Sequence, residues 1–169
     1  MIQPDQHVVL VGLMGVGKST VARVLGERLG RPVLDTDALI EARTGRSVRS
    51  IFADDGEEAF RDVEVEVLAE ALAATRPSVI AAAGGVVLRA ENRAALGQAS
   101  ARVVWLCADP ALLLERVRGG AHRPSLDHDP AGTLRFMHES RGPLYREVAD
   151  VIVSVDGRSV TDVVDAVLR

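Results

Sequence analysis

The sequence predicts a three-layer α/β/α domain in which helices cover both faces of a five-stranded parallel sheet. Five short apolar segments recur along the 169 residues, and each is followed by a segment with the 3.6-residue period of an amphipathic helix. Strands that are apolar on both sides are typical of parallel sheets covered by their crossover helices. No repeat or linker interrupts the pattern, so residues 1–169 are interpreted as a single domain.

The expected elements alternate regularly along the chain. The strands are predicted at 7–12, 31–37, 78–85, 102–108 and 150–155. The helices are predicted at 19–30, 38–44, 57–75, 91–98, 109–118, about 131–148, and from Ser159. Asp37 is expected to cap the second helix. Residues 119–130 combine Gly, Pro, His and Asp without a helical period and are expected to form a mobile lid.

Charge and hydropathy restrict the partners. The net charge is −4, whereas a protein that follows a nucleic-acid backbone needs a broad basic surface. The longest nearly apolar stretch, VIAAAGGVVL, is half the roughly 20 residues that span a bilayer. We therefore expect a cytoplasmic protein that binds neither nucleic acid nor membranes. A monomer is also expected, although neither charge nor hydropathy decides the oligomeric state.

A glycine-rich loop, GLMGVGKST at residues 12–20, lies between the first strand and the first helix. It fits the pattern G-x-x-x-x-G-K-[ST] in the context in which that pattern binds phosphates. Glycines let backbone amides turn towards phosphate oxygens, and the helix N-terminus adds partial positive charge. The loop is therefore predicted to bind ATP. The residues assigned to this contact are Gly12, Gly15, Val16, Gly17, Lys18, Ser19 and Thr20.

Lys18 is the only lysine among the 20 Lys and Arg residues. Its compact ammonium suits the β- and γ-phosphates better than a planar arginine fork does. The lone lysine excludes a GTPase, because the base-reading N-K-x-D motif needs another one. The third strand ends in glycines rather than acidic residues, which disfavours the larger ATPases. The remaining class is a small-molecule or nucleotide kinase with a P-loop kinase fold and a mobile lid.

Two carboxylates, Asp35 and Asp37, end the second strand in the segment LDTD. Alternate side chains of an extended segment share a face, so both can point to the phosphate end of the sheet. One can hold a Mg²⁺-bound water, and the other can orient an acceptor hydroxyl. In isolation, the pair would be explained as a helix cap and a solvated acid.

The chain resembles the shikimate kinases over almost its whole length. The resemblance is carried, in order, by GLMGVGKST, LDTDALIE, IFADDGEEAFRDVE, VIAAAGG, HRPSL, RGPLYREVAD and VDGRS. It implies ATP-dependent phosphorylation of the 3-hydroxyl of shikimate, with Mg²⁺, in the pathway to chorismate and the aromatic amino acids. The expected partners are therefore ATP and shikimate.

The resemblance also implies residue roles. Ser19 and Asp35 match the magnesium ligands, and Asp37 matches the residue that activates the acceptor hydroxyl. The arginines would otherwise be explained as surface ion pairs or solvated groups. By resemblance, Arg61 and Arg141 clamp the shikimate carboxylate. Arg123 matches the lid arginine that, with Lys18, stabilises the transferring phosphate.

Further positions match the walls of the two substrate sites. By resemblance, the shikimate site also contains Phe52, Phe60, Glu64, Gly84 and Gly85, and the adenine site contains Arg118 and Arg158. Two positions depart from the family pattern. Ala83 replaces the first of three glycines, and it would strain the turn if that position required a positive φ. Ser125 replaces an apolar residue of the lid.

Two alternatives remain open at this stage. One is a kinase for another small polyol acid such as gluconate, which differs in its acceptor. The other is a nucleotide-binding regulator without catalysis, which would bind ATP but transfer no phosphoryl group.

Overall fold

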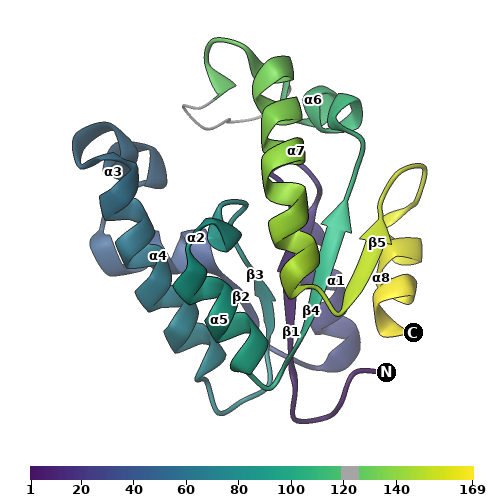
Figure 1. Cartoon of the computed structure of the whole chain (residues 1–169). Helices are drawn as coiled ribbons and strands as arrows, with labels where there is room; N and C mark the ends of the chain where they lie inside the picture. The colour runs from purple at the N-terminus through teal and green to yellow at the C-terminus, as the bar shows by residue number, and fades with distance from the viewer. Residues whose placement is uncertain (119–125) are drawn as a thin grey trace.

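The computed structural model describes residues 1–118 and 126–169, and in these residues it confirms the predicted five-stranded parallel sheet (Figure 1). The strand order is β2-β3-β1-β4-β5, and every neighbouring pair is parallel. The strands are β1 (His7–Val11), β2 (Val33–Asp35), β3 (Val79–Ala81), β4 (Ala101–Cys107) and β5 (Val151–Ser154). All five residues of the central strand β1 are buried, as its unbroken apolar sequence predicts.

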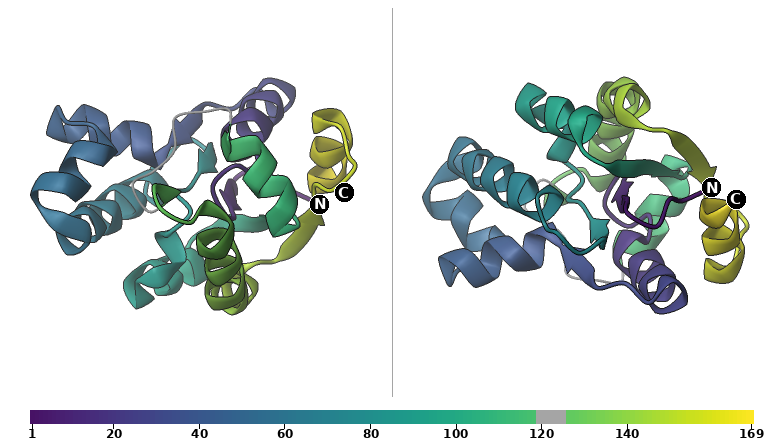
Figure 2. Two further views of the ribbon diagram at one scale, coloured as in Figure 1. Left: turned by 90° about the horizontal axis from the view of Figure 1, so that it is seen from above. Right: turned by 90° about the horizontal axis from the view of Figure 1, so that it is seen from below.

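Helices cover both faces of this sheet. The helices are α1 (Lys18–Leu29), α2 (Thr36–Thr44), α3 (Val48–Asp54), α4 (Gly56–Leu72), α5 (Ala90–Gln98), α6 (Pro110–Arg118), α7 (Pro130–Val148) and α8 (Val160–Leu168), and Val86–Leu88 forms a short 3₁₀ helix. Helices α1 and α8 pack together on one face, and α5 and α7 lie on the other (Figures 1 and 2). Helices α2, α3 and α4 pack on one another beyond the β2 edge of the sheet.

The apolar side chains form two clusters of unequal size. The larger one contains the sheet and the helices that cover it. The smaller one belongs to α2, α3 and α4 and consists of Ile40, Val48, Ile51, Phe60 and Val67. The α2–α4 region therefore has an apolar core of its own.

The predicted boundaries need several corrections. Asp35, not Asp37, caps α2, because β2 ends at Asp35, whose carboxylate accepts from the amides of Asp37 and Ala38. Helix α3 was not predicted; Ser47 caps it by accepting from the Ser50 amide at 3.1 Å. Strand β3 ends at Ala81 rather than residue 85, and α4 spans 56–72 rather than 57–75.

The predicted lid at 119–130 is described only in part. Residues 119–125, including Arg123 and Ser125, lie outside the described residues. Leu126 is 2% exposed and belongs to the larger apolar cluster. Asp129 caps α7 by accepting from the Gly132 amide at 3.0 Å. In the described part of the chain, no helix combines the length and the hydropathy needed to cross a bilayer.

The strand order also shows where a ligand site is expected. From β1 the chain crosses to the β2 edge and returns through β3, whereas β4 and β5 lie on the other side of β1. In open parallel sheets the crevice beyond the carboxyl ends of the strands, at such a reversal, is the usual binding position. The glycine-rich loop follows β1 at this point.

Candidate active site

The phosphate loop connects β1 to α1, and its glycines adopt conformations that other residues avoid. Gly12 has φ 143°, and a Cβ there would lie 2.3 Å from the carbonyl oxygen of Leu106 on β4. Gly17 has φ 102° and forms the N-cap of α1. The Lys18 ammonium donates to the carbonyls of Gly12 at 2.7 Å and Leu13 at 3.0 Å. The helix N-terminus and the lysine charge therefore meet at the loop, as anion binding requires.

A cavity of about 530 Å³ opens in front of this loop, a size typical of small-molecule sites. It is lined by Met14, Gly15, Gly17, Lys18, Ser19, Thr20, Asp35, Asp37, Ala81, Ala82, Ala83, Gly84 and Arg116. The cavity thus brings five of the seven predicted loop residues, all but Gly12 and Val16, together with both predicted carboxylates and Gly84 of the predicted substrate site.

Ser19 and Asp35 provide adjacent oxygen atoms at the loop. The Ser19 hydroxyl donates to Asp35 Oδ2 at 2.9 Å, while Asp35 Oδ1 accepts from the Asp37 amide at 3.0 Å. A hydroxyl and a carboxylate are hard oxygen donors of the kind that Mg²⁺ prefers, so these residues fit a magnesium ion bound together with phosphates. Asp37 lines the same cavity from the first turn of α2.

Arg61 on α4 is held almost completely out of solvent. It is 5% exposed, and its guanidinium donates to both oxygens of the buried Glu64, at 2.9 and 3.1 Å, and to Glu57 at 3.1 Å. The rings of Phe60 and Phe52 lie 5.1 and 5.9 Å from its guanidinium carbon. Four of the predicted substrate-site residues therefore form one cluster, in which the arginine has a single orientation.

Gly85 explains why Arg61 can approach the backbone. A Cβ at Gly85 would lie 2.2 Å from a guanidinium nitrogen of Arg61. The neighbouring Gly84 faces the phosphate loop, because a Cβ there would contact Gly12 O and Met14 N at 3.4 Å. The Gly84–Gly85 turn therefore lies between the phosphate loop and the arginine.

Ala83 does not strain this turn, because the residues with positive φ in the described chain are all glycines. Its amide donates to the Thr36 hydroxyl at 2.9 Å, a buried bond that joins the end of β3 to α2. The departure from three glycines is therefore accommodated without a conformational penalty.

Arg141 on α7 lies on the Arg61 side of the site. Burial lowers the pKa of its guanidinium, and the nearby charge of Arg61 lowers that pKa further, while a hydrogen bond with Tyr145 opposes the shift. Two arginines whose charges act on each other in a partly buried setting form a strong site for an anion. The two residues predicted to clamp the carboxylate are therefore close enough for their charges to interact.

A second cavity, of about 300 Å³, lies on the other side of the phosphate loop. It is lined by Gly15, Val16, Gly17, Thr20, Val21, Arg116, Val155, Arg158, Val160 and Val163. Arg158, predicted beside adenine, lines this cavity together with residues of the phosphate loop, whereas Arg118 is exposed at the end of α6 and lines neither cavity. The sequence reasoning missed Arg116, which lines both cavities and donates to the carbonyls of Gly15 and Val16 at 3.3 and 3.1 Å.

These features define a kinase of the P-loop class with a separate anion site for its acceptor. The phosphate loop, the oxygen donors for a divalent cation and the acidic side chain of Asp37 share one cavity. Arg61 lies across the Gly84–Gly85 turn from the phosphate loop, and its charge acts on Arg141. This arrangement suits phosphoryl transfer, in which catalysis depends mainly on positioning and charge stabilisation.

The chain belongs to the shikimate kinase family, because a model of that family, described as shikimate kinase, matches residues 14–169. A shikimate kinase of Symbiobacterium thermophilum is 50% identical over 166 residues, which cover 96% of this chain and 94% of that protein. The family predicted from the sequence is thereby confirmed.

Solved structures agree with this assignment. The shikimate kinase of Acinetobacter baumannii, solved in complex with shikimate, matches with a TM-score of 0.91 at 38% identity over 96% of this chain and 90% of that one. A gluconokinase of Sinorhizobium meliloti matches with a TM-score of 0.62 at 21% identity over 98% of this chain and 91% of that one. At that identity the gluconokinase shares the fold alone.

Proposed function

We propose that this protein transfers the γ-phosphoryl group of ATP to the 3-hydroxyl of shikimate. The observation that carries the proposal is the position of Arg61 across the Gly84–Gly85 turn from the phosphate loop, where its charge also acts on Arg141. A small carboxylated acceptor can bind its carboxylate at the arginines while its hydroxyl faces Asp37 and the phosphates. The acceptor and the donor would then meet in the 530 Å³ cavity.

Each end of the acceptor has a matching group. The arginines bind its carboxylate through bidentate charge-assisted hydrogen bonds. Asp37 orients the attacking hydroxyl and accepts its proton. Phe52 and Phe60, whose ring centroids lie 4.6 Å apart, provide an apolar wall for the carbocycle. Because the proposed substrate is an anion, this acidic protein still needs arginines at its binding site.

The phosphate loop holds the donor. Backbone amides of residues 12–20 and the Lys18 ammonium bind the β- and γ-phosphates, and Arg123 in the lid is proposed to join Lys18 on the transferring group. Ser19 and Asp35 would hold Mg²⁺, which neutralises phosphate charge when bound. The cavity with Arg116 and Arg158 is proposed to receive the nucleoside. Arg118 stays a prediction for the same contact.

The protein is also proposed to act as a monomer in the cytoplasm, where ATP is supplied. Sedimentation equilibrium would test the monomer, and a dimer at working concentrations would contradict it.

The decisive experiment is acceptor-dependent ADP release with ATP and Mg²⁺, comparing shikimate, quinate, gluconate and no acceptor. We expect turnover with shikimate only, and Asp37→Asn should lower kcat by about 100-fold or more because the hydroxyl loses its base. Asp62→Asn, which changes an exposed carboxylate on α4, is the matched control and should leave turnover unchanged.

Two results would overturn the proposal. Turnover with gluconate but not shikimate would identify the polyol-acid alternative. ATP binding without turnover on any acceptor would identify a nucleotide-binding regulator.

A further inference from the structure

We propose that Tyr145 is a positioning residue of the acceptor site: its buried hydroxyl fixes the Gly84 carbonyl and the Arg141 guanidinium in the arrangement that receives the acceptor carboxylate. This inference rests on the proposed function, because Arg141 is assigned there to the carboxylate of shikimate. Tyr145 itself touches no substrate in this scheme and acts through its two neighbours.

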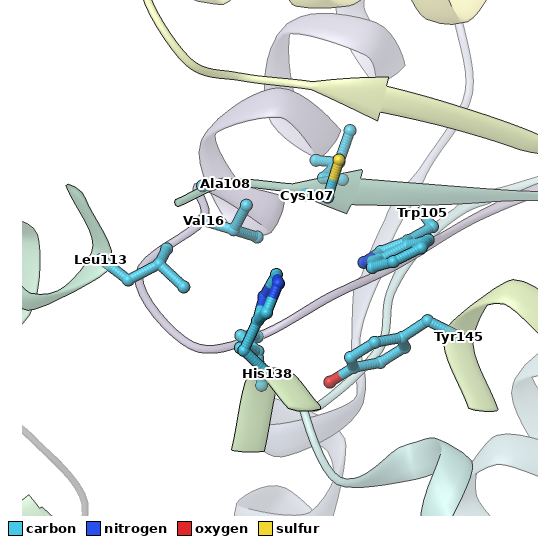
Figure 3. Close-up of a pocket in the computed structure, with 9 residues that line it drawn as sticks. Val16, Trp105, Cys107, Ala108, Leu113, His138 and Tyr145 are labelled. Atoms are coloured by element: carbon cyan, nitrogen blue, oxygen red, sulfur yellow. The ribbon is translucent and has the colours of Figure 1, made fainter. Parts of the chain in front are cut away.

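The ring of Tyr145 has a single defined position. Tyr145 lies on α7, is 1% exposed, and stacks on Trp105 of β4 with centroids 5.7 Å apart and an interplanar angle of 27°. Figure 3 shows the two rings face to face beside a small cavity, with Val16, Leu113 and His138 on its other side. That cavity measures only about 10 Å³, barely the space of one water molecule. The ring therefore cannot swing, and its hydroxyl has one direction.

The hydroxyl donates to the Gly84 carbonyl, from α7 to the segment that follows β3. Gly84 is in close contact with the phosphate loop, and Gly85 is in close contact with the Arg61 guanidinium. A carbonyl fixed at Gly84 therefore fixes the distance between the donor site and the acceptor site. Without this bond, a buried carbonyl would lose its partner and the turn would be free to shift.

The same hydroxyl serves Arg141, four residues earlier on α7 and so on the same helix face. The pKa values of Arg141 and Tyr145 depend on each other, because the phenol oxygen can accept from the nearby guanidinium and each charged form favours the other. Burial raises the pKa of Tyr145 to about 12, although the charge of Arg141 opposes that shift. The phenol is therefore neutral at working pH and uses both its donor and its acceptor capacity.

A neutral partner has a functional consequence for the arginine pair. Arg61 is oriented by two carboxylates, Glu57 and Glu64, which cancel part of its charge. The charge of Glu57 also acts on Arg141, and a further carboxylate bound directly to Arg141 would cancel the remaining attraction for an anionic acceptor. Tyr145 instead orients Arg141 without neutralising it, so the positive charge stays available for the carboxylate of the substrate.

The test is Tyr145→Phe, which keeps the stacked ring and removes only the hydroxyl. Calorimetry should show the Kd for shikimate rising roughly tenfold, the effect of one lost hydrogen bond to a charged group, with the Kd for ATP within about twofold of wild type. In turnover, KM for shikimate should rise more than kcat falls. Val167→Ala, in the buried face of α8, is the matched control, which should lower the melting temperature and change neither Kd.

A double-mutant cycle with Arg141→Lys then tests the route of the effect. If Tyr145 acts through Arg141, adding Tyr145→Phe to Arg141→Lys should weaken shikimate binding by about threefold or less, because the two losses overlap. Fully additive losses would overturn that route. Should Tyr145→Phe fail to fold, Trp105→Phe loosens the same ring and should raise the Kd for shikimate by about threefold.

The inference is overturned if the tested variant has the wild-type Kd for shikimate. It is also overturned if the Kd for shikimate and the Kd for ATP rise equally, because an equal rise would mean that Tyr145 has only a structural role. A wild-type protein that binds ATP but not shikimate would instead overturn the proposed function, and the two failures are therefore distinguishable.

Discussion

Gly85 is a position at which one added methyl group should strongly weaken acceptor binding. A methyl group there would lie 2.2 Å from a guanidinium nitrogen of Arg61, which two glutamates hold in place. Gly85→Ala should therefore displace the guanidinium and raise the Kd for shikimate by about tenfold or more, with ATP binding unchanged. Gly97→Ala is the matched control, since nothing lies within 4 Å of a Cβ there. Equal shikimate affinity in the two variants would refute this role for Gly85.

Tyr145 is the only tyrosine of the chain, so its ionisation can be followed directly by ultraviolet absorbance. Burial raises its pKa from the ordinary value of 10 to about 12. Between these two values the unfolded chain loses this proton while the folded chain keeps it, so the free energy of unfolding should fall as the pH rises. The folded protein should show tyrosinate near pH 12, and the chain in denaturant near pH 10. A single titration near 10 in both states would contradict the buried phenol.

Sequence reasoning missed Arg116 because only tertiary packing distinguishes it from Arg118. Arg116 and Arg118 are two residues apart on α6 and equally basic, but their side chains leave the helix in nearly opposite directions. The packing of α6 against the phosphate loop decides that Arg116 is the one in contact. Ala83 likewise could not be evaluated before its backbone conformation was known.

At the scale of elements, one side chain at the start of α2 has two roles, in the stability of the helix and in the predicted magnesium site. Asp35 caps α2 and also accepts from Ser19 at the predicted magnesium site. Asn is as good an N-cap as Asp, so Asp35→Asn should keep the stability of the protein, whereas Asp35→Ala should lower the free energy of unfolding by about 1 kcal/mol. Both variants should need more Mg²⁺ for half-maximal turnover, because an anionic ligand is lost.

The control for this pair is Val167→Ala, which removes buried volume from α8 at a residue that lines neither cavity. It should lower stability without changing the Mg²⁺ requirement. If Asp35→Asn were destabilised as much as Asp35→Ala, the carboxylate would matter to α2 through its charge rather than its hydrogen bonds. Wild-type Mg²⁺ dependence in both variants would remove Asp35 from the metal site.

The elements themselves were largely predictable, since the signals for the strands and the phosphate loop are local. Central strands such as β1 are uninterrupted apolar runs, and the G-x-x-x-x-G-K-[ST] pattern needs only eight consecutive residues. Helix α3 was missed because its seven residues are too few to show a helical period. Asp37 was taken for a cap because apolar patterning places strand ends only to within a few residues.

At the scale of the whole molecule, the two apolar clusters predict two regions of different local stability. Helix α3 has seven residues and packs on α2 and α4, within the smaller cluster. Segments with few buried contacts open at a lower free energy than core strands such as β1. Amides of α3 should therefore exchange with deuterium about 100-fold faster than amides of β1 or β4.

Substrates should then protect the two regions separately, because Arg61 belongs to α4 whereas the phosphate loop belongs to the main sheet. Shikimate should slow exchange in α3 and α4, and ADP should slow it mainly in residues 12–20. Arg61→Ala should abolish the protection by shikimate and keep the protection by ADP, since it removes a ligand of the acceptor alone. Uniform protection of both regions by either ligand would mean that the clusters open as one unit. Acceptor and nucleotide binding would then be coupled through the Gly84–Gly85 turn, and Gly85→Ala should uncouple them.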